Sequence, residues 1–109
     1  MEKTYNKLVR DKIPEIIKNN GGIPKVRILD NEEYRKELHK KLLEEYNEVL
    51  CAINSNNYVE ELADMLEVIK SIAEIEGVSL ERIIEIAKEK SKKRGSFKEK
   101  IYLEKVIED

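Results

Sequence analysis

Apolar residues recur at intervals of three and four along two long stretches of the chain, the spacing of a helix that buries one side. The first stretch contains Leu38, Leu42, Tyr46, Val49, Leu50 and Ile53, and the second contains Leu62, Met65, Leu66, Val68, Ile69, Ile72 and Ala73. We predict helices over residues 31–53 and from about residue 57 to 76, capped at Asp30 and at Asn56 or Asn57, with Gly77 ending the second. The polar residues 54–57 would turn the chain, so the two helices form an antiparallel hairpin.

Shorter patterns predict the remaining elements. Pro14 suits the first turn of a short helix over residues 13–19, and Ser79 opens a third long helix that closes at Gly95. The apolar stripe that this last helix should bury consists of Leu80, Ile83, Ile84 and Ala87. Alternating residues at 25–29 predict a short strand, and residues 101–107, which are also rich in β-forming residues, are its plausible partner in a minor two-stranded β ribbon. The fold class is therefore mainly all-α, an antiparallel helical bundle within a single domain of residues 1–109.

Acidic residues interrupt the apolar faces of the predicted hairpin. At about 100° per residue, Glu45 projects within about 20° of Leu38 and about 40° of Val49, and Glu61 points between Val68 and Ile72. An ionised carboxylate in apolar surroundings is costly unless it is paired or binds a metal. We therefore predict that a cation binds these carboxylates on the buried side of the hairpin.

The register of the hairpin gathers four such carboxylates. Glu48 and Glu61 lie about equally far from the turn, as do Glu45 and Asp64. Carboxylates three residues apart share a helix face, so the two pairs should meet in one oxygen-lined pocket. Oxygen ligands without clustered histidine or cysteine favour Mg²⁺, or Mn²⁺, over Zn²⁺. The chemistry that this predicts is metal-assisted hydrolysis of a phosphoanhydride, with Glu44 as a candidate to bind a second ion or to accept the proton of the attacking water.

The acidic pattern resembles a known family. Glu44-Glu45-x-x-Glu48 followed by Glu61-x-x-Asp64 is similar to the linked motifs of the all-α nucleoside triphosphate pyrophosphohydrolases, which include MazG-like proteins, dimeric dUTPases and phosphoribosyl-ATP pyrophosphohydrolases. Residues 5–14 (YNKLVRDKIP) and 93–97 (KRGSF) resemble a small MazG-like subgroup labelled phosphoribosyl-ATP pyrophosphohydrolase-like. The resemblance spans nearly the whole chain.

The resemblance implies an enzyme that cleaves between the α- and β-phosphates of a (deoxy)nucleoside triphosphate or related nucleotide and releases pyrophosphate. It implies Glu45, Glu48, Glu61 and Asp64 as Mg²⁺ ligands. The histidine-pathway enzymes carry a Tyr-His pair shortly after the last motif, whereas Asp64 is followed here by Met65-Leu66-Glu67-Val68. A house-cleaning nucleotide pyrophosphatase is therefore favoured, and phosphoribosyl-ATP hydrolysis in histidine biosynthesis is the alternative.

Two basic segments are candidates to bind the phosphates. By the resemblance, Lys7, Arg10 and Lys12 near the N-terminus would approach the substrate, as would Lys93 or Arg94 in the basic tail. Each segment also has an ordinary interpretation, because exposed cations are solvated and cations at a helix C-terminus complement its dipole. Phe97 is a candidate to stack on the base, and a core aromatic is the competing reading.

Composition narrows the partners. A formal net charge of −2 gives no general attraction to nucleic acid or to an anionic membrane, and no apolar run is long enough to cross a bilayer. The single cysteine, Cys51, cannot form an internal disulfide and fits a reducing cytoplasm, where we expect the protein to work. We interpret His39, the only histidine, as a structural or solvated residue.

The apolar arc of the second long helix is too wide for one hairpin and one further helix to cover. We therefore expect dimerisation to complete the helical bundle, in a homodimer or a dimer of dimers. A helical interaction module with a merely solvated acidic face is the alternative of another class. The position of Glu45 and Glu61 inside the apolar stripes argues against it.

Overall fold

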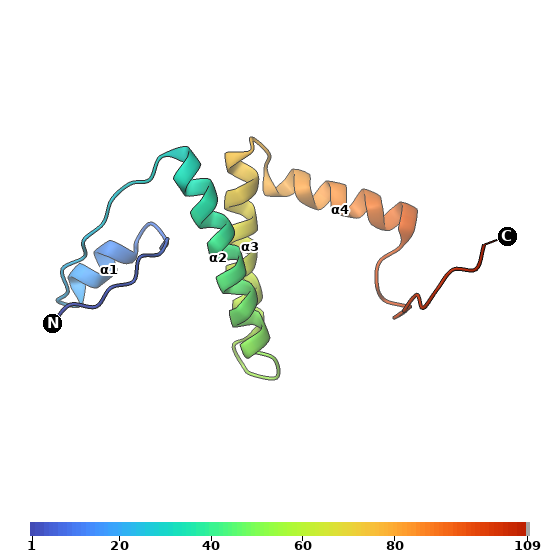
Figure 1. Cartoon of the computed structure of the whole chain (residues 1–109), viewed down its shortest axis with the longest axis horizontal. Helices are drawn as coiled ribbons and strands as arrows, with labels where there is room; N and C mark the ends of the chain where they lie inside the picture. Colours follow the sequence, from blue (N-terminus) through green and yellow to red (C-terminus); the bar gives the residue numbers. More distant parts are fainter. Residues whose placement is uncertain (109) are drawn as a thin grey trace.

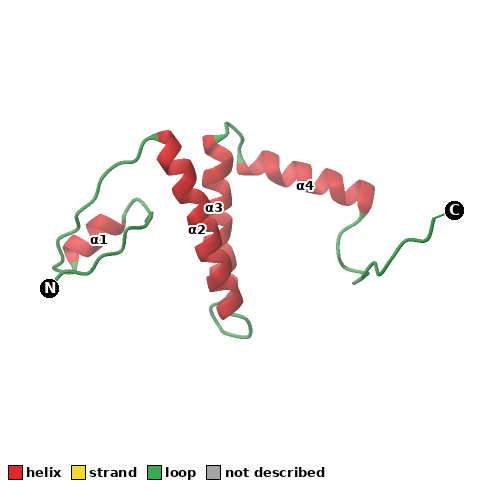
Figure 2. Ribbon diagram, viewed as in Figure 1, coloured by secondary structure: helices red, strands yellow, loops and turns green. Residues whose placement is uncertain are grey.

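The computed structural model describes residues 1–108, which form four helices and no strand (Figure 2). The helices are α1 (Ile13–Asn19), α2 (Asn31–Cys51), α3 (Tyr58–Ile75) and α4 (Leu80–Arg94). Each begins and ends within a few residues of its prediction. The all-α fold class is thereby confirmed.

Side chains at the helix starts explain two of these boundaries. The Asp30 carboxylate accepts a hydrogen bond from the backbone N–H of Glu33 at 2.8 Å, and the Ser79 hydroxyl accepts one from Arg82 at 3.1 Å. The asparagine cap predicted for α3 is wrong in detail. Asn57 precedes α3, but its side chain caps nothing, and its backbone N–H donates instead to the Ser55 hydroxyl at 3.2 Å.

The α2–α3 hairpin is the centre of the molecule (Figure 1). Its apolar core is small, because the buried apolar residues of the two helices are only Leu38 and Val49 of α2 and Val68 and Ala73 of α3. Glu45 is buried among them. The predicted intrusion of a carboxylate into the apolar face of the hairpin is therefore observed.

Much of the apolar surface predicted to be buried is exposed in a single chain. Five residues of the predicted α2 and α3 faces retain 44–52% of their accessible surface, namely Tyr46, Leu50, Ile53, Leu62 and Leu66. The predicted stripe of α4 is also open, with Ile83 37% and Ile84 43% exposed, and α4 has no buried residue. The reason is that α4 leaves the end of α3 and points away from the hairpin, so it covers little of α2 or α3 (Figure 1).

The predicted β ribbon is not formed within the described residues. Residues 25–29 lead into α2, whereas residues 101–107 follow α4 on the opposite side of the hairpin (Figure 1). Val26 and Ile28 are 61% and 94% exposed, so neither packs on the helices. The two segments of one chain are too far apart to pair.

The chain is extended. Its radius of gyration is 18.9 Å, whereas a compact domain of this size has about 13 Å. It measures 67 × 35 × 25 Å along its principal axes, and no large side chain in residues 1–108 is fully buried. None of the four helices is both long and apolar enough to cross a membrane. A single chain thus leaves its apolar helix faces largely uncovered.

Candidate functional site

Three carboxylates from α2 and α3 converge on one point of the hairpin. Glu45 of α2 and Glu61 and Asp64 of α3 each place one carboxylate oxygen within 4.8 Å of the other two. Their distances from the turn explain this, because the antiparallel helices bring Glu45 opposite Asp64, and Glu61 lies one turn from Asp64 on the same face. We call Glu45, Glu61 and Asp64 the acidic cluster.

Glu45 is the most strongly buried member of the acidic cluster, with 9% of its surface exposed. Burial raises the pKa of its carboxyl group, and the charges of Asp64, Glu44 and Glu61 raise it further. Lys41 opposes this from the preceding turn, with its ammonium 3.7 Å from the Glu45 carboxylate. The negative charge of Glu45 is therefore only partly compensated.

Glu61 and Asp64 lie half-buried across from Glu45. Desolvation raises the pKa of Glu61, and the neighbouring charges of Asp64, Glu48 and Glu60 add to the effect. Glu48 is exposed and stands outside the three converging oxygens, but its charge acts on Glu61. The structure thus unites three of the four predicted metal ligands and places the fourth beside them.

Glu44 has a different electrostatic environment. Partial burial raises its pKa, but the ammonium groups of Lys41, at 3.2 Å, and Lys7, at 3.4 Å, outweigh this and leave the pKa below its ordinary value. The pKa of Glu44 is thus shifted in the opposite direction to the pKa of Glu45. Lys41 was not identified from the sequence as a partner of these carboxylates. Its spacing was the available signal, because Lys41 lies three residues before Glu44 and four before Glu45.

The N-terminal segment lies against the carboxylates. The guanidinium of Arg10 donates a hydrogen bond to Asp64 at 2.8 Å, and Lys7 reaches Glu44. Both pairs are well exposed, so each is worth at most about 1 kcal/mol. Lys12 stands at the start of α1 and makes no ion pair with any described residue. Two of the three predicted N-terminal cations thus meet the acidic residues directly.

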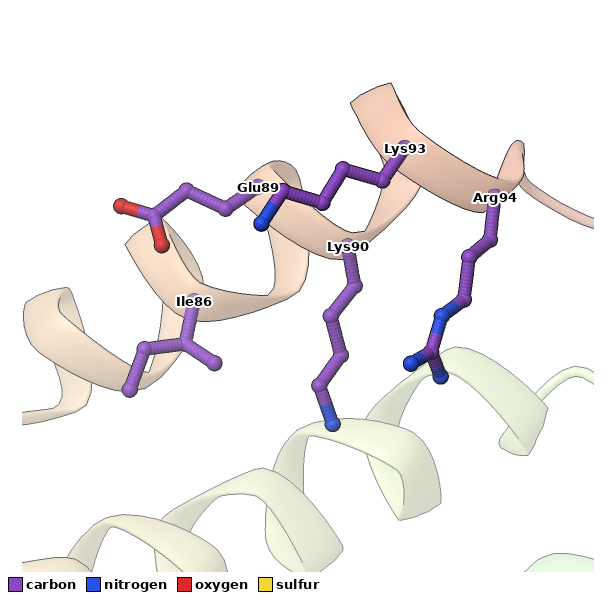
Figure 3. Close-up of a pocket in the computed structure, with 5 residues that line it drawn as sticks. All are labelled: Ile86, Glu89, Lys90, Lys93 and Arg94. Carbon is purple, nitrogen blue, oxygen red and sulfur yellow. The ribbon is translucent and has the colours of Figure 1, made fainter.

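The second basic segment lies elsewhere. Lys93 and Arg94 close α4, and together with Ile86, Glu89 and Lys90 they line a hollow of about 240 Å³ (Figure 3). In one chain α4 points away from the α2–α3 hairpin that carries the acidic cluster (Figure 1), and Phe97, which follows α4, is 96% exposed. A single chain therefore does not bring Lys93, Arg94 or Phe97 to the carboxylates.

Cys51 and His39 show no catalytic arrangement. Cys51 is exposed at the end of α2, and a ring nitrogen of His39 lies 2.7 Å from the Arg35 carbonyl one turn earlier. His39 also borders an apolar groove of about 370 Å³ with Leu42, Ile69 and Ile83, at the end of the hairpin where α4 begins. Neither residue touches the acidic cluster.

The raised pKa of Glu45 predicts how the stability of the metal-free protein responds to its removal. A carboxyl group whose folded pKa is above its unfolded pKa makes the folded state lose stability as pH rises between the two values. At pH 7 and in a metal chelator, we expect Glu45→Gln to raise Tm by about 2–5 °C. The gain should shrink as the pH falls through the raised pKa of Glu45, because the carboxyl group of the folded native protein is then protonated.

Thermal denaturation followed by circular dichroism from acid to neutral pH measures this effect. Glu67→Gln is the matched control, because Glu67 is exposed on α3 and forms no ion pair within residues 1–108. A Glu45→Gln protein that is less stable than the native chain at pH 7 would contradict the electrostatic account.

Comparison with known proteins assigns the chain to a family. The family model of the MazG nucleotide pyrophosphohydrolase domain matches residues 33–96, which include the acidic cluster, Glu44 and Glu48. An uncharacterized protein of Mycolicibacterium smegmatis (strain ATCC 700084 / mc(2)155) is 47% identical over 45 residues, which are 41% of this chain and 46% of that relative. The chain thus matches about half the length of this relative. No solved structure matches the chain. Because the family model covers more than half of its residues, the chain belongs to the MazG nucleotide pyrophosphohydrolase domain family.

Proposed function

We propose that this protein hydrolyses the α–β phosphoanhydride of a (deoxy)nucleoside triphosphate or a related nucleotide, with Mg²⁺ or Mn²⁺ as its cofactor. The products are a nucleoside monophosphate and pyrophosphate. The observation that carries the proposal is the convergence of Glu45, Glu61 and Asp64 within 4.8 Å of one another. Membership of the MazG family supports the reaction class.

The donor set of the acidic cluster fits a hard divalent ion. Glu45, Glu61 and Asp64 offer only carboxylate oxygens, which are the ligands that Mg²⁺ and Mn²⁺ prefer. The raised pKa values of Glu45 and Glu61 reflect burial and mutual repulsion, both of which a bound cation would relieve. Glu48 is close enough to influence Glu61 and is our fourth proposed ligand.

When bound, the ion would neutralise phosphate oxygens and lower the pKa of a coordinated water. The protein supplies the remaining functions through its own side chains. Lys41 and Lys7 lower the pKa of Glu44 and both contact its Oε1, so its other carboxylate oxygen would orient the attacking water and accept its proton. The new bond joins the water oxygen to phosphorus as the bridging oxygen leaves with pyrophosphate.

The cations of the N-terminal segment would bind the phosphates. Arg10 and Lys7 already lie at the carboxylates through weak, exposed pairs. Guanidinium and ammonium groups bind phosphate as well as carboxylate, so Arg10 and Lys7 can exchange a carboxylate partner for a phosphate. We include Lys12 as a weaker candidate, because it belongs to the same segment without an ion pair to any described residue.

Self-association is part of the proposal. On α2 the exposed apolar residues Leu43, Tyr46, Leu50 and Ile53 recur at intervals of three and four, and Val59, Leu62 and Leu66 do the same on α3. Two such stripes on one hairpin are typical of helices that pack into a four-helix bundle. We propose that two hairpins pack through these stripes into a homodimer, with a dimer of dimers as the larger assembly. Within it, Lys93, Arg94 and Phe97 would reach the nucleotide bound by the partner subunit.

Turnover tests the enzymatic proposal. Pyrophosphate release should be measured over a panel of nucleoside triphosphates with Mg²⁺, for the native protein and for Glu48→Gln and Asp64→Asn. We expect turnover to fall at least about 100-fold in each variant, because each substitution removes one proposed carboxylate ligand of the ion. Glu67→Gln on the exposed side of α3 should retain full activity.

Two outcomes would contradict this. Unchanged turnover in Asp64→Asn would remove the acidic cluster from the reaction. No turnover on any nucleotide, together with no Mg²⁺ binding by calorimetry, would leave the helical interaction module as the better description.

Substitution of Arg10 should change Mg²⁺ affinity and turnover in opposite directions. In the absence of nucleotide its guanidinium competes with a divalent ion for Asp64. We expect Arg10→Ala to tighten Mg²⁺ binding by about two- to five-fold, the size of an exposed ion pair, and to weaken turnover through the lost phosphate contact. Calorimetry and the pyrophosphate assay measure the two effects. Lys18→Ala removes the same charge from α1 and should change neither, whereas weaker Mg²⁺ binding in Arg10→Ala would refute the competition.

Sedimentation tests self-association. We expect the native protein to be dimeric or larger at micromolar concentration, and Leu50→Glu with Leu66→Glu to shift it to monomers, because two charges per chain would enter the apolar interface. Ile16→Glu is the matched control, since Ile16 on α1 is 49% exposed, like Leu50 at 47% and Leu66 at 47%, and lies outside the stripes. A native protein that sediments only as a monomer would remove the dimer from the proposal.

A further inference from the structure

Two extended segments of the chain have backbone groups without partners. Among residues 1–108, no N–H or C=O group of residues 23–29 or 101–108 makes a backbone hydrogen bond to another residue. Polar and apolar residues alternate from Lys25 to Ile28, and residues 101–107 are rich in β-branched and aromatic side chains. Such an exposed edge is a template for pairing with another strand.

The first segment, residues 25–29, is held in place beside α2. Arg27 donates hydrogen bonds to both carboxylate oxygens of Glu33, one of them at 3.0 Å, and Asp30 caps the same helix. Because side chains alternate along an extended chain, Val26 and Ile28 face away from Arg27. They are 61% and 94% exposed, so one side of this segment is fixed and the other is apolar and open.

The second segment, residues 101–107, follows α4. Gly95 ends the helix, and a turn closed by the Lys100 N–H to the Phe97 carbonyl precedes the segment. Ile101, Leu103 and Ile107 share one side of the extended chain with Lys105 and are 80%, 73% and 84% exposed. This segment therefore offers exposed apolar side chains and unpaired backbone groups to a partner strand.

One chain cannot join the two segments, because they lie on opposite sides of the hairpin in a molecule 67 Å long (Figure 1). A second copy can join them. We propose that residues 25–29 of one protomer pair with residues 101–107 of another as a two-stranded ribbon, formed twice by the symmetry of a dimer. This inference rests on the self-association proposed above and specifies a second contact within it.

The ribbon has a consequence for the site. It ties the tail that follows Lys93 and Arg94 to the N-terminal part of the other protomer, which also carries Lys7 and Arg10. An isolated two-stranded ribbon is marginal, but the packed hairpins hold its strands at high effective concentration. The basic end of α4 is thereby brought toward the partner's acidic cluster.

Cysteine cross-linking between separately prepared chains tests the ribbon. In a Cys51→Ser background, Ile28→Cys is mixed and refolded with each of seven single-cysteine variants spanning residues 101–107. Paired strands place opposite Cα atoms about 4.5–5.5 Å apart, which suits a disulfide. We expect intermolecular disulfides, identified by mass spectrometry, whose yield is several-fold higher at alternate tail positions.

Ile23→Cys is the matched control, because Ile23 is 96% exposed, like Ile28, and lies outside residues 25–29. It should give low yields without alternation. A dimer in sedimentation without alternating cross-links overturns the ribbon and leaves the dimer standing, whereas a monomeric native protein removes both. A disulfide that forms only within a single Ile28→Cys/Leu103→Cys chain also overturns the exchange between copies.

Discussion

The structure depends on a conflict between apolar packing and negative charge inside the α2–α3 hairpin. Glu45 stands among the residues that hold the two helices together, and Glu61 and Asp64 face it from α3. Burying a carboxylate raises its pKa and costs free energy unless a cation compensates it. In the single chain that compensation is incomplete, because Lys41 lies 3.7 Å from Glu45 and also serves Glu44. The hairpin is thus predisposed to bind positive charge.

The ion pairs of Arg10 and Lys7 with the carboxylates are weak enough for another ion to replace one partner. Arg10 and Lys7 come from a segment whose nearby helix, α1, has no buried residue, and their ion pairs are exposed to solvent. Exposed pairs contribute little stability, so a competing ion or phosphate can replace one partner at small cost. A more deeply buried pair would have made the same residues structural rather than functional.

The helices and the acidic residues on their apolar faces were predictable from the sequence because both depend on residues only a few positions apart. Asp30 and Ser79 marked helix starts because they cap locally, and the position of Glu45 followed from helical geometry alone. The Arg10–Asp64 pair joins residues 54 positions apart, and no periodicity reports such a contact. Periodicity also shows that a face is apolar without showing what covers it, which is why it predicts burial for Leu50 and for the α4 stripe that a single chain leaves exposed.

The placement of the apolar stripes allows assembly and an open site to coexist. At about 100° per residue, the exposed stripe of α2 lies about 80–160° around the helix from Glu45, and that of α3 lies similarly far from Glu61. A partner that covers the stripes would therefore pack beside the carboxylates rather than over them. The acidic cluster would keep its access to solvent and to a charged ligand. An interface centred on the acids would instead add desolvation to a site that is already short of positive charge.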